Sequence, residues 1–142
     1  TTSQTILMHN NGDVDSWNES DLRKETLPAI LECFPENIKN AVREISIRYC
    51  TKYNTGQTSD KLWVPSAENV GLSSGRATGC PHYPIFTDNA SRSKTKYPIY
   101  WWLRDRDPDQ SDNRFMTIEE SGRDYPLGAD FMNVKVCFGF CL

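Results

Sequence analysis

Three aspartates alternate at Asp105, Asp107 and Asp109, and this is the strongest metal-ligand pattern in the chain. Calcium-binding EF-hand loops open with the same D-x-D-x-D spacing, because Ca²⁺ prefers a cluster of oxygen ligands. The sixth loop position, normally Gly, is Gln110, and the twelfth, normally Glu, is Met116. We therefore interpret the run as a solvated acidic loop without a metal, and keep weak calcium binding in another geometry as the alternative.

Cysteine and histidine form no convincing metal or disulfide pattern. The isolated Cys80-Pro81-His82 has no second ligand pair at zinc spacing. The five cysteines are too widely spaced for the framework of a small secreted domain. In a strand, Cys137 and Cys141 would lie roughly 13 Å apart, too far for a disulfide. We expect reduced, mostly buried thiols.

Catalytic motifs are also missing from the sequence. It contains no G-x-S-x-G, H-E-x-x-H, P-loop or G-x-G-x-x-G pattern. Nothing local activates Cys33, Cys50 or Cys80 as a nucleophile. We predict a domain that is not an enzyme and needs no cofactor.

The polar run between Asp105 and Asn133 is rich in residue types that dominate binding interfaces. Arg, Tyr and large apolar side chains supply most of the energy at interface hot spots, and Asp adds adaptable hydrogen bonds. Its contact-type residues are Arg106, Arg114, Arg123, Tyr125, Phe131 and Met132. We interpret the run as a binding surface, with an ordinary hydrophilic surface as the alternative.

Length and charge limit the classes of protein. The 142 residues suit a single domain, residues 1–142, with a real core. The net charge of −3 argues against a nucleic-acid partner. No run of 18 apolar residues is present, so we expect no membrane insertion. Because the chain starts at Thr1 and not at Met, we expect the C-terminal domain of a longer protein.

Helices are predicted in the first third of the chain. Ser20 is a good N-cap for a helix that runs to Phe34, and Pro28 should kink it or divide it into two pieces. A second helix is predicted over residues 36–46, from the apolar spacing of its sequence. Residues 47–53 then alternate, and whether they form a strand or a helix end stays open.

The middle of the chain is predicted to be mostly loop. Residues 54–60 (NTGQTSD) read as a polar turn, residues 62–64 (LWV) as a short buried strand, and Ser66 as the cap of a helical turn. Residues 71–96 should cross the surface as long loops that are anchored by Tyr83, Ile85 and Phe86.

The last third, residues 97–142, is predicted to be a scaffold of strands that brackets the binding run. IYWWLR (99–104) carries bulky residues on both faces, which is typical of a central strand covered on both sides. FMTIEES (115–121) should be a strand that ends in a turn at Ser121-Gly122. A final strand is predicted over 134–140, where Gly139 leaves space for a large neighbour such as a Trp.

Several motifs together resemble an uncharacterised bacterial and phage domain family. They are W-x-x-S-x-L-R (Trp17 to Arg23), FPENIKNAVREI, SDKLWVPSAE (Ser59 to Glu68), WWLR and the terminal FGFCL. That family is similar to domains with a C-type-lectin-like fold, including variable proteins that are diversified by retroelements. The resemblance implies an α+β fold, with two helices packed on a small twisted antiparallel sheet that carries long loops.

The resemblance also implies a function. It suggests a non-catalytic receptor-binding domain on a phage virion or a bacterial cell surface, which binds a cell-surface protein or glycan through residues 105–133. In such proteins the WWLR and final strands are fixed, and the segment between them varies. Carried over by position, the exposed ligand-binding candidates are Asp105, Arg106, Asp107, Asp109, Asp112, Asn113, Arg114, Arg123, Asp124, Tyr125, Asp130, Phe131 and Met132.

Two other functions stay open. One is a calcium-dependent carbohydrate-binding lectin built on the acidic loop, although the calcium–sugar motif of such lectins is absent. The other is an oxidase-type enzyme on the same fold, which needs a redox-active cysteine pair. The only pair close in sequence is Cys137 and Cys141.

Overall fold

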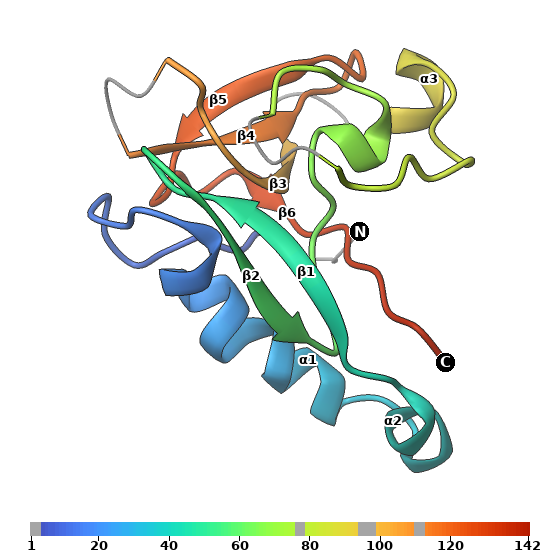
Figure 1. Ribbon diagram of the computed structural model, residues 1–142. Coiled ribbons are helices and arrows are strands. Elements are labelled where there is room, and N and C mark those ends of the chain that lie inside the picture. Colours follow the sequence, from blue (N-terminus) through green and yellow to red (C-terminus); the bar gives the residue numbers. More distant parts are fainter. Residues whose placement is uncertain (1–3, 76–78, 94–98, 110–112) are drawn as a thin grey trace.

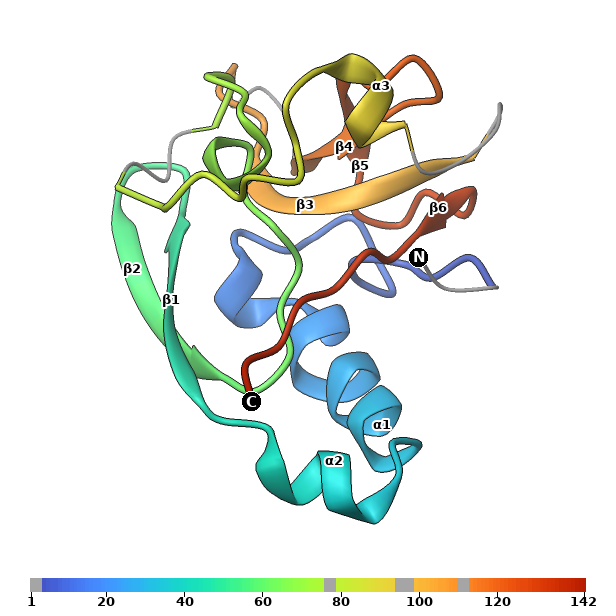
Figure 2. The same cartoon turned by 90° about the vertical axis from the view of Figure 1, so that its right-hand side faces the viewer.

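The computed structural model describes residues 4–75, 79–93, 99–109 and 113–142. The chain is an α+β protein with two β-sheets and short helices. A two-stranded hairpin lies along one side, helices α1 and α2 lie beneath it, and the second sheet closes the top (Figure 2).

The first helical region consists of consecutive segments. A 3₁₀ turn, Trp17–Glu19, is followed by a π-helical turn, Leu22–Thr26, and then by α1, Leu27–Glu32. Pro28 lies in the first turn of α1, just after the π-helical turn. The backbone stays helical from Leu22 to Glu32, since Thr26 and Leu27 both have right-handed helical angles. The helix is therefore not divided at Pro28; its irregularity is the change from a π-helical to an α-helical turn just before this residue.

Helix α2, Glu36–Ala41, is shorter than predicted, and the expected helix over residues 36–46 is wrong in its second half. Val42 already has extended backbone angles, and strand β1 spans Ile45–Cys50. The β-branched residues Val42, Ile45 and Ile47 favour extended backbone, and they place their side chains against the core.

Strand β2, Thr55–Asp60, replaces the predicted polar turn over residues 54–60. It pairs antiparallel with β1, from Ile45 opposite Asp60 to Cys50 opposite Thr55. The prediction failed because β2 exposes one face, and polar residues are tolerated there once the backbone has a partner strand.

The second sheet has the strand order β5-β4-β3-β6 (Figure 1). Its strands are β3 (Tyr100–Arg106), β4 (Arg114–Ile118), β5 (Asp124–Gly128) and β6 (Val134–Lys135). β6 runs parallel to β3, so the sheet is mixed and the expectation of a purely antiparallel sheet is wrong. The turn at Ser121-Gly122 is confirmed: the Gly122 N–H donates to Glu119 O, and Gly122 has a φ of 81°.

The predicted final strand over residues 134–140 is also wrong beyond Lys135. The chain leaves the sheet there and makes single bridges, Gly139 with Trp63 and Cys141 with Arg43. Gly139 faces the Trp63 ring, because a Cβ at Gly139 would lie 3.3 Å from it. The prediction that Gly139 makes room for a large aromatic neighbour is confirmed.

Strand β3 separates two apolar cores, which confirms its central position. Trp102 faces the larger core with Trp17, Leu27 and Phe115, and the helices contribute to the same core. Trp101 and Leu103 face a smaller core with Phe86 and Ile118. The predicted anchor Phe86 is thus buried, whereas Ile85 is exposed and anchors nothing.

Candidate functional site

Strand register brings two tyrosines onto one face of the second sheet. Trp102 pairs with Thr117 in β4, and Thr117 pairs with Tyr125 in β5. Directly paired residues point to the same face, so Tyr125 lies on the Trp102 side of the sheet. Tyr100, two residues before Trp102, points the same way because side chains alternate along a strand.

Phe131 completes an exposed group of rings. The Tyr100 and Tyr125 ring centroids are 6.0 Å apart, and the Phe131 ring stands edge-on to Tyr100 at 6.2 Å. Tyr125 is 48% exposed and Phe131 is 40% exposed. We call Tyr100, Tyr125 and Phe131 the aromatic patch. Two exposed rings that both pack on a third, half-buried ring are typical of an interaction surface.

Other predicted residues border the aromatic patch along the chain. Arg123 and Asp124 precede Tyr125, and Asp130 and Met132 flank Phe131. Arg123, Asp130 and Met132 are exposed, and Asp124 is half-buried. Basic and acidic residues therefore flank the rings in the sequence, and both types are common at the polar rim of protein interfaces.

Asp105, Arg106 and Asp107 are buried, so the expectation that they are exposed is wrong. An Asp105 carboxylate oxygen accepts the Ala67 N–H at 2.6 Å. The Arg106 guanidinium donates to the Asp15 carboxylate at 2.6 Å, across most of the chain. These polar residues lie inside because each has a protein partner, which sequence spacing alone does not reveal.

The remaining candidates lie at the opposite end of β3. The Arg114 guanidinium pairs with the Asp107 carboxylate at 2.7 Å, and Asn113 accepts a hydrogen bond from Arg106. Asp109 is exposed, and its backbone N–H donates to Asp107. Asp112 lies outside the described residues.

The predicted surface therefore does not form one continuous face. Arg114 and Tyr125 point to opposite faces of the sheet, because Tyr125 pairs with Thr117, three residues along β4 from Arg114. The structure brings Tyr125 and Phe131 together on Tyr100, whereas Asn113 and Arg114 bind Arg106 and Asp107.

Tyr100 is the residue that the sequence interpretation missed. It was assigned to the fixed scaffold because it belongs to the IYWWLR strand. The alternation of Tyr100 with Trp102 is visible in the sequence. The Tyr100 ring is nevertheless only half-buried, because β3 begins at the edge of the larger core. Tyr100 is identified by its ring contacts with Tyr125 and Phe131, and these contacts follow from the strand register, which the sequence does not provide.

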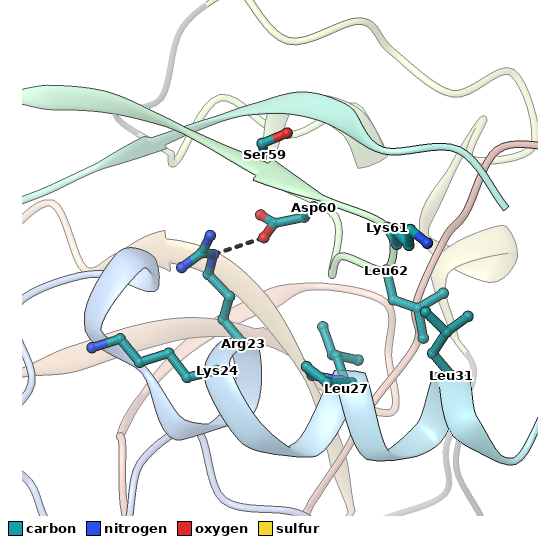
Figure 3. Close-up of a pocket in the computed structure, with 9 residues that line it drawn as sticks. Arg23, Lys24, Leu27, Leu31, Ser59, Asp60, Lys61 and Leu62 are labelled. Carbon is teal, nitrogen blue, oxygen red and sulfur yellow. Dashed lines mark hydrogen bonds and ion pairs between the residues drawn. The ribbon is translucent and has the colours of Figure 1, made fainter.

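A hollow lies between the first helical region and β2 (Figure 3). This groove has a volume of about 410 Å³, and Leu27, Leu31 and Leu62 contribute apolar surface to it. Arg23 reaches from the helix toward β2, where its Nε donates to the Asp60 carboxylate at 2.8 Å.

The charged groups of the groove bind each other or their neighbours. Asp60 also accepts hydrogen bonds from Trp17 Nε1 and Thr58 Oγ1. Lys24 pairs with Glu19 at 2.9 Å, and this hydrogen bond holds the pKa of Glu19 below its ordinary value. The groove thus joins the helix to the hairpin and has few polar groups left to orient a ligand.

Within residues 4–75, 79–93, 99–109 and 113–142, no three His, Cys, Asp or Glu side chains converge as metal ligands. None of the helices in these ranges combines the length and the apolar character that crossing a membrane requires.

Comparison with known proteins gives one match. The family model described as "Domain of unknown function (DUF6273)" matches residues 2–130. No curated protein and no solved structure matches the chain. The family match covers the helices, the hairpin and the strands that carry most of the aromatic patch.

Proposed function

Because the chain belongs to the DUF6273 family, whose function is unknown, we propose a function from its own surface: it is a non-catalytic domain that binds a cell-surface protein through the aromatic patch. The observation that carries this proposal is that two exposed rings, Tyr125 and Phe131, both pack on the half-buried Tyr100 ring. Large aromatic rings are the side chains most often found at interface hot spots.

The cost of exposing these rings supports a binding role. Each ring is large, and contiguous apolar surface is normally buried in a folded protein. The patch adjoins the larger core through Tyr100, so its base is rigid. A rigid aromatic surface loses little conformational entropy on binding, which favours affinity.

We further propose that the domain has a C-type-lectin-like fold and is a retroelement-diversified variable protein of a phage or bacterial surface. Two features support this. The WWLR strand is central and buried, as a fixed scaffold requires, and the residues that follow it include exposed positions that tolerate change. In this proposal diversity acts at Arg123, Tyr125, Asp130, Phe131 and Met132.

The calcium-dependent lectin is the weaker alternative. Its ligands would come from the acidic loop, but the Asp105 and Asp107 carboxylates already accept protein hydrogen bonds or pair with Arg114. A cation would have to displace these partners, at a cost in stability.

A binding screen tests the proposal and distinguishes it from the lectin. The labelled domain is applied to a displayed library of cell-surface proteins and to a glycan array, each with and without a calcium chelator. We expect signals on proteins that persist with chelator and vanish when Tyr125 and Phe131 are both replaced by Ala.

The control is Tyr53→Ala, because Tyr53 is 77% exposed and lies in the β1–β2 turn outside the aromatic patch. It should leave every signal unchanged. Signals restricted to glycans and abolished by chelator would replace the proposal with the lectin. Protein signals that survive loss of both rings would exclude the aromatic patch as the binding site.

A further inference from the structure

Two cysteines that are distant in sequence are packed together in the fold. Cys50 ends β1 and Cys80 lies in the loop that follows residue 79, and the two side chains form a buried cluster separate from both apolar cores. Both are thiols, 1% and 8% exposed respectively. A disulfide requires two Cβ atoms in close approach, and a packed pair meets that first requirement.

A buried arginine contacts one of these sulfurs. Arg104 is only 2% exposed. Its guanidinium donates to Arg48 O (2.7 Å), Val64 O (2.7 Å), Asn69 Oδ1 (2.9 Å) and Cys80 Sγ (3.4 Å). The buried guanidinium thus places a positive charge beside the Cys80 sulfur and holds the side chain in position.

The loop that carries Cys80 is held in place from the Glu68–Val70 turn. The Cys80 N–H donates to Glu68 Oε2 at 2.6 Å, and Asn69 Nδ2 donates to Pro81 O at 2.6 Å. These bonds hold the loop that carries Cys80 in place, and its thiol packs beside Cys50.

A hollow gives access to one thiol and not to the other. A cavity of about 280 Å³ opens between β1 and the loop, and Cys80, Arg104 and Tyr83 are among the residues that line it. Cys50 is not among them and is almost completely buried. A reagent that enters the cavity therefore meets Cys80 first.

We propose that Cys80 and Cys50 form a reversible disulfide, with Cys80 as the attacking and Cys50 as the resolving thiol. The oxidant is a small disulfide, RSSR. The Cys80 thiolate attacks one of its sulfurs, which forms Cys80–S–S–R and releases RS⁻. Cys50 then attacks Cys80 Sγ, which forms the Cys50–Cys80 bond and releases the second RS⁻.

The exchange balances without any other reactant. The two protein thiols lose two protons and two electrons, and RSSR becomes two RSH. The new bond ties β1 to the 79–83 loop and closes a long segment of chain, so it stabilises the fold by constraining the unfolded state. This site is independent of the aromatic patch and of the proposed binding function.

Oxidised glutathione is the probe for the experiment. The reduced protein is treated with it, remaining thiols are alkylated, and intact mass and peptides are measured. We expect a linked peptide pair containing Cys50 and Cys80, and a melting temperature raised by roughly 5–15 °C. The exposed Cys33 should take up glutathione as a mixed disulfide, and Cys33→Ser should leave the Cys50–Cys80 link intact.

Single serine variants assign the order of attack. In Cys50→Ser, glutathione should stay trapped on Cys80, whereas in Cys80→Ser it should not modify Cys50. Arg104→Gln should slow the trapping at Cys80 about tenfold relative to Cys33, and Arg104→Lys should restore part of the rate, because Lys keeps a positive charge beside the attacking sulfur. Arg43→Lys, at an exposed position, is the matched control.

The wild-type peptide map decides the proposal even where a variant fails to fold. Reduced Cys50 and Cys80 under conditions that modify Cys33 would overturn it. A link from Cys80 to any other cysteine would overturn it too. Trapping on Cys50 in place of Cys80 would overturn the assigned order.

Discussion

Gly139 has no side chain, and this lets the C-terminal segment pack closely against Trp63. The bare Cα lies against the Trp63 ring, and backbone hydrogen bonds join the two residues in both directions. Trp63 cannot move away easily, because it is buried and its Nε1 donates to the Tyr83 hydroxyl at 3.0 Å. The glycine is therefore required by packing.

Replacing Gly139 by Ala should lower the free energy of unfolding by about 1–3 kcal/mol, since the new methyl group overpacks the Trp63 contact. Gly12→Ala is the control, because a Cβ there would meet only the Asp130 carboxylate, at 3.9 Å. Urea denaturation of both variants measures the effect. Equal stabilities would show that the C-terminal segment adjusts freely.

Asp60 is the residue that joins two sequence motifs into one structure. Its carboxylate accepts from Trp17 Nε1 and from Arg23 Nε, which are the two ends of the W-x-x-S-x-L-R motif. Asp60 itself belongs to the S-D-K-L-W-V-P motif. Both motifs are thus explained by structural contacts.

Asp60→Asn should destabilise the fold by about 1–3 kcal/mol, because it leaves Arg23 without a charged partner in a site that is mostly buried. Glu19→Gln removes the exposed ion pair with Lys24 and should change stability by less than about 0.5 kcal/mol. Chemical denaturation compares the two. A larger loss for Glu19→Gln would contradict the assigned role of Asp60.

At the scale of elements, the hydrophobic pattern predicted some parts of the fold and missed others. Strand β3 was predictable because both of its faces are bulky. The β2 strand was not, because its residues are polar and only pairing with β1 makes them a strand. The parallel β6 was not predictable either, since its two residues pair with β3 only in the finished fold.

The candidate site was predictable to a similar extent. Tyr125 and Phe131 were identified by residue type, and the structure brings them together. Asp105, Arg106 and Asp107 are charged and were therefore expected at the surface, yet each is buried, and the partners of Asp105 and Arg106 lie on distant segments. Such pairing depends on contacts across the whole chain and cannot be read from local spacing.

The short helix α3, Asn89–Arg92, carries a pH-sensitive cap. Its N-cap Asp88 accepts the Ser91 N–H at 2.8 Å, and this bond above all holds the Asp88 pKa below its ordinary value. A lowered carboxyl pKa stabilises the folded state above the unfolded pKa of about 3.9, and the contribution is lost as pH falls through the folded pKa.

The stability difference between wild type and Asp88→Asn should therefore shrink as pH falls from about 6 to about 3. Asn keeps a capping oxygen but has no charge to lose, so it isolates the ionisation. Thermal melts of both proteins across this range provide the measurement. A difference that stays constant with pH would show that the Asp88 charge does not contribute.

At the scale of the whole molecule, different residues of β3 belong to the cores and to the proposed binding surface. Its central residues separate the two cores, its C-terminal end carries the buried Asp105 and Arg106, and its first residue, Tyr100, belongs to the aromatic patch. The buried end fixes the sheet, and the other end carries the rings. Binding and folding can therefore be changed separately.

The most direct test of this separation is the affinity of a protein ligand from the screen. The affinity is measured for the wild type, for the double variant Tyr125→Ala/Phe131→Ala and for Tyr53→Ala. The double variant should bind at least about 30-fold more weakly, because two hot-spot rings are lost. Its unfolding midpoint should stay close to that of wild type, and Tyr53→Ala should bind normally. Unchanged affinity in a folded double variant would contradict the account.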